Sequence, residues 1–342
     1  MRTALAAAGQ GATRWAMARA MQLALDAFVT TALFDADGEA VFALGDGQVR
    51  WAGGAVQLPH DGPVLVAARH PTREGVITGG DDGRLVWSRR DGTQLLAEAK
   101  GRWIESLATQ PGAGLVAFGA GREARVIDLA DPAFVRTFAH ERSVADVALD
   151  ARARRLAVAT YGGAALWYAR IAEQQPVMLR WAGSHIGVRF SPDGRFLMSS
   201  MQENALHGWR LSDAKDMRMG GYPAKVRSLA FLDGGKLLAT AGANGVVLWP
   251  FGGADGPMGK QAMEIGFDER ALVVQVAAEA DGTKLAVGLN DGRIWACDVR
   301  SGQRADVRTD VGAPISALSL AGGRIAWGDE EGAAGVADLP AV

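Results

Sequence analysis

A short turn followed by a strand that carries tryptophan recurs along the chain at a spacing of about 40 residues. The clearest copies are residues 45–51 (GDGQVRW), 82–87 (DGRLVW) and 244–249 (NGVVLW), and residues 291–294 (DGRI) are a further copy. Asp, Asn and Gly before alternating apolar residues are typical of a tight hairpin turn that leads into a strand. A fixed period of this size indicates an array of four-stranded propeller blades. The pattern therefore predicts an all-β propeller, and it leaves the function open because propellers carry many unrelated functions.

Two independent features give the number of repeats. Alternation of apolar and polar residues predicts first strands centred on Thr31, Val66, Ser106, Asp146, Val188, Leu229, Val276 and Ala317. The second turn of each repeat, between its second and third strands, falls at Gly47, Gly83, Gly121, Gly163, Ala205, Gly245, Gly292 and Gly332. Both series count eight, so we expect an eight-bladed ring, with seven blades as the alternative count.

The final repeat has only three predicted strands, and an uncovered sheet edge invites pairing with other chains. We therefore expect the residues just before the first repeat, from Met21 to Ala27, to supply the missing outer strand and close the ring. Residues 1–20 are rich in alanine and include Arg2, Arg14 and Arg19, without an apolar run long enough to cross a bilayer. We expect a disordered or loosely helical leader over 1–20 and a single domain over 21–342.

The composition narrows the classes of partner. The 342 residues carry a formal net charge of −2, and 49% are hydrophobic, which is typical of a globular protein. Nucleic acid and anionic membranes attract concentrated basic surfaces, so the balance of charge predicts neither partner. Cys297 is the sole cysteine in the sequence, so an internal disulfide is excluded. We expect a cytoplasmic monomer.

The chain resembles WD40 repeat propellers over residues 21–342. His60, Thr78, Asp82 and Trp87 match that family's tetrad of turn histidine, strand hydroxyl, turn aspartate and strand tryptophan. The resemblance implies that these four side chains form a buried relay. The match is uneven, because no Trp-Asp pair occurs in the sequence and the sixth repeat has Tyr222 where the family has histidine.

Residues 183–194 (GSHIGVRFSPDG), together with 221–223 (GYP), are similar to bacterial single-domain WD40 proteins. Some of that group accompany metallochaperone GTPases. The resemblance thus implies a partner protein in bacterial metal homeostasis.

The sequence shows no motif that is typical of a phosphate-binding, metal-binding or catalytic site. Residues 253–260 have the wrong glycine spacing for a phosphate-binding loop, and residues 35–38 lack the later acidic ligands of a calcium loop. The five histidines show no metal-ligand spacing, and apolar neighbours predict that Cys297 is a buried, inert thiol. We predict no catalytic residues, no metal and no cofactor. A ring can still gather distant side chains at its channel, so a propeller enzyme or small-ligand binder that uses the central channel is the alternative.

One face of the ring, which we call the top face, is expected to carry both the loops entering each first strand and the second turns. The predicted partner-binding residues on the entering loops are Arg102, Trp103, Arg142, His185, Lys225 and Arg270, and those on second turns are Tyr161 and Glu203. Arginine and aromatic residues are frequent anchors of interfaces. We therefore predict a non-catalytic protein-interaction scaffold, with a solvated charged rim as the alternative for this face and a methionine-rich interface in the fifth and sixth repeats as another.

Overall fold

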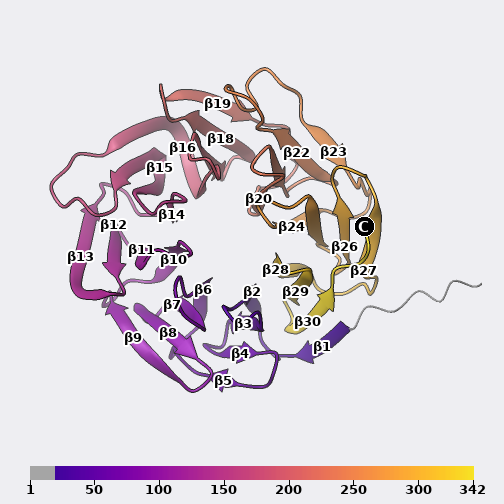
Figure 1. The fold of residues 1–342 in the computed structure, drawn as a ribbon, viewed down its shortest axis with the longest axis horizontal. Helices are drawn as coiled ribbons and strands as arrows, with labels where there is room; N and C mark the ends of the chain where they lie inside the picture. Colours follow the sequence, from indigo (N-terminus) through magenta and orange to yellow (C-terminus); the bar gives the residue numbers. More distant parts are fainter. Residues whose placement is uncertain (1–19) are drawn as a thin grey trace, which may run out of the picture.

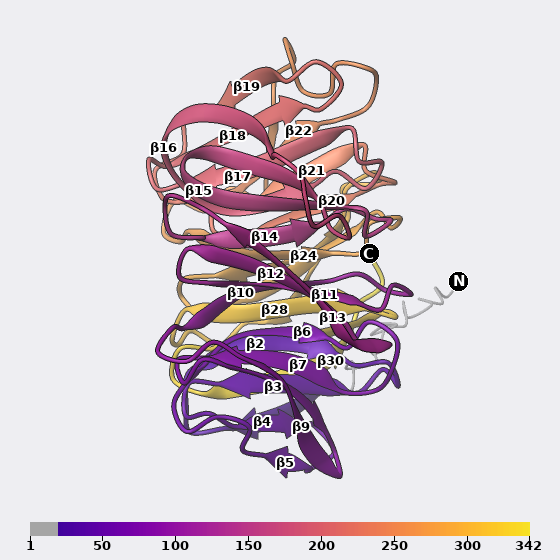
Figure 2. The same ribbon diagram turned by 90° about the vertical axis from the view of Figure 1, so that its left-hand side faces the viewer.

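The computed structural model describes residues 20–342, which fold entirely into strands and turns arranged radially around a central axis (Figure 1). The first and last strands lie side by side, so the chain forms a closed ring. Figure 2 shows the ring edge-on, with the sheets stacked around it. The predicted all-β propeller is confirmed. None of the described residues forms a helix that could span a membrane. The predicted leader lies outside the described residues, except that β1 begins at Ala20.

Hydrogen bonding joins the strands into seven sheets, six of which have four strands. Three four-stranded sheets precede the six-stranded sheet along the chain: β2 (Val29–Phe34), β3 (Ala40–Leu44), β4 (Val49–Trp51) and β5 (Val56–Gln57); β6 (Val64–Arg69), β7 (Val76–Gly80), β8 (Arg84–Arg89) and β9 (Gly92–Glu98); and β10 (Ile104–Thr109), β11 (Leu115–Ala120), β12 (Glu123–Asp128) and β13 (Asp131–Ala139). Two more follow it: β20 (Leu229–Leu232), β21 (Leu237–Thr240), β22 (Val246–Pro250) and β23 (Met263–Ile265); and β24 (Val273–Ala278), β25 (Lys284–Leu289), β26 (Ile294–Asp298) and β27 (Arg304–Arg308). The last sheet combines the end of the chain, β28 (Ile315–Ala321), β29 (Arg324–Asp329) and β30 (Ala333–Asp338), with the N-terminal strand β1 (Ala20–Ala24).

The seventh sheet has six strands and corresponds to the fourth and fifth predicted repeats. Its strands are β14 (Asp146–Leu149), β15 (Arg155–Tyr168), β16 (Val177–Phe190), β17 (Phe196–Met201), β18 (Ala205–Arg210) and β19 (Lys215–Met219). The two repeats are joined because β15 and β16 continue through the turns that were expected to separate strands, with Tyr161 paired to Ser184. The prediction of eight separate sheets is therefore not supported, and the alternative count of seven is the one that the hydrogen-bonded sheets give.

The long strand β15 doubles back on itself. The backbone amide of Ala169 donates to the carbonyl of Arg154 at 2.9 Å, so the residues that flank the two ends of β15 are neighbours. A straight strand of this length would hold its ends about 40 Å apart. The reversal lies at Gly162 and Gly163, whose φ angles of 90° and 140° are readily adopted only by glycine.

The N-terminal strand closes the ring as predicted. Strand β1 pairs antiparallel with β30, with Ala20 opposite Ala337 and Ala24 opposite Ala333. The outer edge of the last sheet is thus covered. The Ser316 hydroxyl of β28 donates to the carbonyl of Val29 of β2 at 2.7 Å, which joins the last sheet to the first.

The core lies between neighbouring sheets. The second strands are the most buried, and β11 and β17 are buried at every position. The two faces of each second strand pack against two different neighbouring sheets, so both faces are buried. The sequence of such a strand is therefore continuously apolar and does not alternate with polar residues. Met198, Met217 and Met219 are buried together in one apolar cluster of this core, so core packing explains why these three methionines lie close together.

Backbone hydrogen bonds define the two faces of the ring. On the top face, second turns contact entering loops, as where Gln202 N donates to Ser184 O and Asn290 N donates to Leu272 O, both at 2.9 Å. On the opposite face, which we call the bottom face, the first turns of neighbouring repeats meet, as where Asp233 N donates to Gly282 O at 2.7 Å.

Candidate functional site: the top face and the channel

Three of the four tetrad residues form a chain of hydrogen bonds below the top face. His60 Nδ1 lies 3.0 Å from Asp82 Oδ1, and His60 Nε2 lies 2.9 Å from Thr78 Oγ1. An ionised carboxylate can only accept, so Nδ1 donates to Asp82. The Thr78 hydroxyl also lies 3.3 Å from the carbonyl oxygen of Val86 on the neighbouring strand. Trp87 lies outside the chain, because its indole Nε1 donates instead to the carbonyl of Glu74 at 2.9 Å. The predicted four-residue relay therefore has three members.

Asp82 remains ionised although it is partly buried. Burial raises the pKa of this carboxyl, but hydrogen bonds from the Arg84 amide and from His60 outweigh burial and hold the pKa below its usual range. The relay therefore ties the entering loop at His60 to the second turn at Asp82, and it stiffens this part of the top face.

The sixth repeat builds a similar chain with tyrosine in place of histidine. The Tyr222 hydroxyl lies 2.7 Å from Thr240 Oγ1 and accepts from Trp249 Nε1 at 2.7 Å. Asn244, at the turn position equivalent to Asp82, donates from Nδ2 to the carbonyl oxygens of Asp268 and Ala271. Tyr222 thus ties its entering loop to the second and third strands of its own sheet, and Asn244 ties the second turn to the entering loop of the next repeat.

His185 is not available to a partner, which corrects its predicted role. Its side chain is fully buried, with Nδ1 2.7 Å from Ser199 Oγ and Nε2 3.0 Å from the carbonyl of Trp181. Burial lowers its pKa below the usual value. The histidine lies within β16, where it pairs with Met201, rather than on an exposed loop.

The other predicted top-face residues differ in how accessible they are. Trp103 and Tyr161 are exposed by 61% and 64%, and Arg142, Glu203 and Arg270 are also exposed. Two more of the predicted residues are less available to a partner. Arg102 is paired with Glu123 Oε1 at 2.8 Å, and Lys225 is half-buried.

Four exposed apolar residues on the top face were not predicted from the sequence. They lie on entering loops and are Phe28, Leu58, Phe267 and Val311. The sequence did contain a signal for these residues. Each is an apolar residue in the loop between one repeat and the first strand of the next, where polar residues are usual. Together with Trp103 and Tyr161 they form what we call the apolar set of the top face.

The channel contains a cavity of about 490 Å³ that is lined by inner strands of several repeats. Asp146 on its wall is already paired, since Oδ2 accepts from the Val188 amide at 2.9 Å and from Arg189 Nη1 at 3.0 Å. Glu105 and Arg227 also line the cavity and are exposed, and neither has an ion pair within residues 20–342. The cavity can therefore offer one free carboxylate and one free guanidinium group.

Metal-binding side chains are not gathered at the top face or in the channel within the part of the chain that the structure describes. Within residues 20–342 no group of three or more His, Cys, Asp or Glu side chains is arranged to hold a metal ion. Cys297 is buried as predicted, and burial raises the pKa of its thiol to about 11, so the thiol stays protonated at neutral pH.

Comparison with known proteins gives the fold alone. No family model matches the chain, and no curated protein matches it. Among solved structures, the crystal structure of the computationally designed Ika8 protein is similar, with a TM-score of 0.75 and 17% sequence identity over 92% of this chain and 97% of that chain. This likeness supports the propeller and carries no information on function.

Proposed function

We propose that the protein is a non-catalytic scaffold that presents its top face to a partner protein. The distribution of exposed large hydrophobic side chains carries this proposal. Six of the fifteen such residues within 20–342 form the apolar set of the top face, whereas the bottom face has two, Tyr168 and Ile171. The others lie along the outer strands.

The composition of the top face suits an interface rather than a solvated rim. Aromatic side chains supply large contact areas, and arginine is enriched at interfaces. Arg142 and Arg270 are exposed and have no ion-pair partner among the described residues, so both are free to pair with an acidic partner. The relays beneath hold the loops in place, which lowers the entropic cost of binding.

The proposal also includes a family and a first candidate partner. We assign the chain to the WD40-like propellers because of the His60, Asp82 and Thr78 relay. The first partner to test is a metallochaperone GTPase, which the resemblance of residues 183–194 suggests, with the protein acting as a cytoplasmic monomer.

We also propose that the six-stranded sheet acts as two blades, which would give the ring eight. The reversal within β15 supports this count, because it supplies a second and a third strand to one blade. An experimental structure in which β15 runs straight would contradict it.

The test is affinity capture from the native host, with mass spectrometry of the retained proteins. The double variant Trp103→Ser/Phe267→Ser should lose most of the captured partner, since both side chains are exposed and their loss leaves the core intact. The variant Arg142→Glu/Lys225→Glu should weaken capture through charge. Ile171→Ser/Val177→Ser, which removes two exposed apolar side chains away from the top face, is the matched control and should capture as the wild type does. Equal capture by all folded variants would place the interface elsewhere.

A small ligand in the channel is the second candidate function. The observation in its favour is that Glu105 and Arg227 line one cavity without partners, an arrangement that suits a ligand with both an amino and an acidic group. A screen of amino acids by thermal shift tests it. A stabilising compound whose effect is lost in both Glu105→Gln and Arg227→Gln would favour this function over the scaffold.

A further inference from the structure

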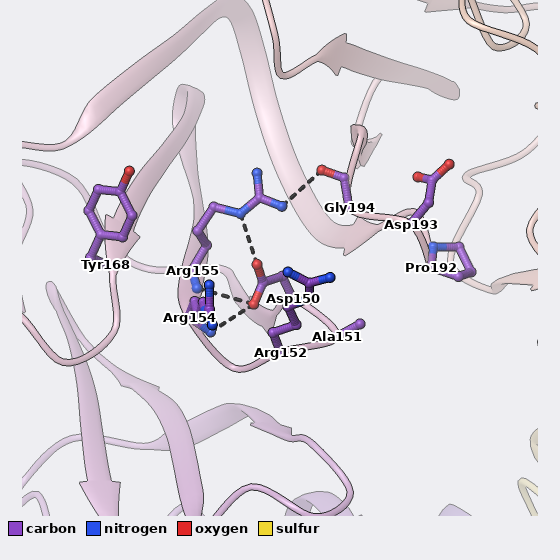
Figure 3. A pocket seen from close by; sticks show the side chains of 9 residues that line it. All are labelled: Asp150, Ala151, Arg152, Arg154, Arg155, Tyr168, Pro192, Asp193 and Gly194. Carbon is purple, nitrogen blue, oxygen red and sulfur yellow. Dashed lines mark hydrogen bonds and ion pairs between the residues drawn. The ribbon is translucent and has the colours of Figure 1, made fainter.

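A pocket of about 420 Å³ opens on the bottom face between the first turns of the fourth and fifth repeats (Figure 3). One wall is the turn between β14 and β15, and the other is the turn between β16 and β17. Tyr168, at the end of β15, lies on the side next to Arg155 (Figure 3). This volume is within the usual range for small-ligand sites.

Asp150 and Arg155 form the rigid base of the pocket. Asp150 is buried, and its carboxylate accepts from the Arg154 amide at 2.8 Å and from Arg155 Nε at 2.8 Å. Arg155 Nη2 also donates to the carbonyl of Gly194 at 2.9 Å, so this guanidinium group bridges the two turns. Burial raises the pKa of Asp150, but the hydrogen bonds from Arg155 and Arg154 outweigh burial and keep the carboxyl ionised.

Two further arginines line the pocket without neutralising partners. Arg152 and Arg154 are exposed, and neither has an ion pair among the residues that the structure describes. The other carboxylate at the pocket, Asp193, is occupied, because it accepts from Ser191 Oγ at 2.7 Å and from Arg195 Nε at 2.6 Å. The pocket therefore has an excess of positive charge of about two units at neutral pH.

We propose that this pocket binds the dianionic phosphoryl group of a ligand. Guanidinium groups match the oxygen geometry of phosphate with paired hydrogen bonds, and a dianion balances both free arginines, whereas a single carboxylate balances one. Tyr168, exposed by 58%, adds a hydroxyl group that can donate to a phosphate oxygen. The cavity is larger than a phosphate ion, so the phosphoryl group belongs to a phosphorylated side chain of a protein or to a small phosphate ester.

Calorimetric titration of the full chain tests the proposal with four probes: inorganic phosphate, glucose 6-phosphate, a phosphoserine peptide and acetate. The phosphorylated probes should bind and acetate should not. Arg152→Gln/Arg154→Gln should weaken phosphate binding about tenfold or more, because it removes charge-assisted hydrogen bonds. Arg69→Gln, which removes one exposed arginine of β6 outside the pocket and the top face, is the control and should bind as the wild type does.

The source of the phosphoryl group follows from the ranking of the probes. Tighter binding of the peptide would indicate a phosphorylated protein, and tighter binding of glucose 6-phosphate would indicate a metabolite. Binding should also strengthen as the pH rises through about 6, where the phosphoryl group becomes dianionic. The proposal is overturned if no phosphorylated probe binds, if acetate binds as well as phosphate, or if a double variant with wild-type melting behaviour binds phosphate unchanged.

Discussion

Replacing Asp82 by alanine removes the acceptor for a buried histidine. His60 is fully buried, and Asp82 is the partner of its Nδ1 at 3.0 Å. Leaving a buried donor unsatisfied costs about 1–3 kcal/mol. The substitution also removes a hydrogen bond that caps the second turn, from the Arg84 amide to Asp82 Oδ1, worth about 0.5–1.5 kcal/mol.

Asp291 provides the control that separates these two effects. It has the same position in a second turn with the same Asp-Gly-Arg sequence, and it accepts from the Arg293 amide at 3.2 Å, but no histidine lies behind it. Asp291→Ala therefore loses the cap and an ion pair with the Arg293 side chain, at 2.8 Å from Nε, but it leaves no buried histidine unpaired. The ion pair contributes about 0.2–1 kcal/mol. The difference between the two variants is therefore a lower bound on the cost of the unpaired His60, which is about 1–3 kcal/mol.

Thermal unfolding followed by circular dichroism measures this difference. Unfolding a chain of this length carries an entropy of about 0.7 kcal/mol/K, so Asp82→Ala should melt below Asp291→Ala, by up to about 4 °C. Asp82→Asn keeps an acceptor oxygen and should recover part of the loss. Equal melting temperatures for Asp82→Ala and Asp291→Ala would show that the His60 contact contributes no more to stability than the ion pair between Asp291 and Arg293, and would contradict the prediction.

Four further outcomes are expected. Because the pKa of Asp82 is lower in the folded chain than its usual 3.8, its stabilisation is present above that pH and is lost as the pH falls below it, so the melting difference between wild type and Asp82→Ala should shrink in acid. Deletion of residues 1–25 should lower the melting temperature and promote aggregation by exposing the edge of β30, as light scattering would show. Gly328→Ala should destabilise the chain by about 1–3 kcal/mol because its Cβ would lie 2.4 Å from a Val29 methyl group, whereas Gly92→Ala, with nothing within 4 Å, should have little effect in urea titrations. The Cys297 thiol should resist iodoacetamide at pH 8 until the protein unfolds.

The features that the sequence predicted well depend on local chemistry. Turn residues recur at a fixed period, and strand alternation lies between them, so the propeller and the closing strand near Met21 were predictable. The contact between His60 and Asp82 followed from a family pattern in which both positions are fixed by the turns.

The features that were missed depend on register and on packing between repeats. Trp87 was expected to join the relay, but its position opposite Ile77 on β7 brings its indole to the carbonyl of Glu74 in the first turn. His185 was expected on a loop, but it lies inside a strand and is covered by its neighbours. The top face was predicted from charged and aromatic residues close to the first strands and second turns, and the apolar residues Phe28 and Phe267 on the same entering loops were overlooked.

Site-specific photo-cross-linking tests the proposed scaffold most directly. A photoreactive phenylalanine analogue would replace Trp103 or Tyr161 on the top face, or Tyr168 on the bottom face, all of which are exposed to a similar degree. Irradiation in cells of the native host should give the same cross-linked protein from positions 103 and 161 and none of it from position 168. A partner cross-linked from position 168 alone, or equally from all three positions, would contradict the assignment of binding to the top face.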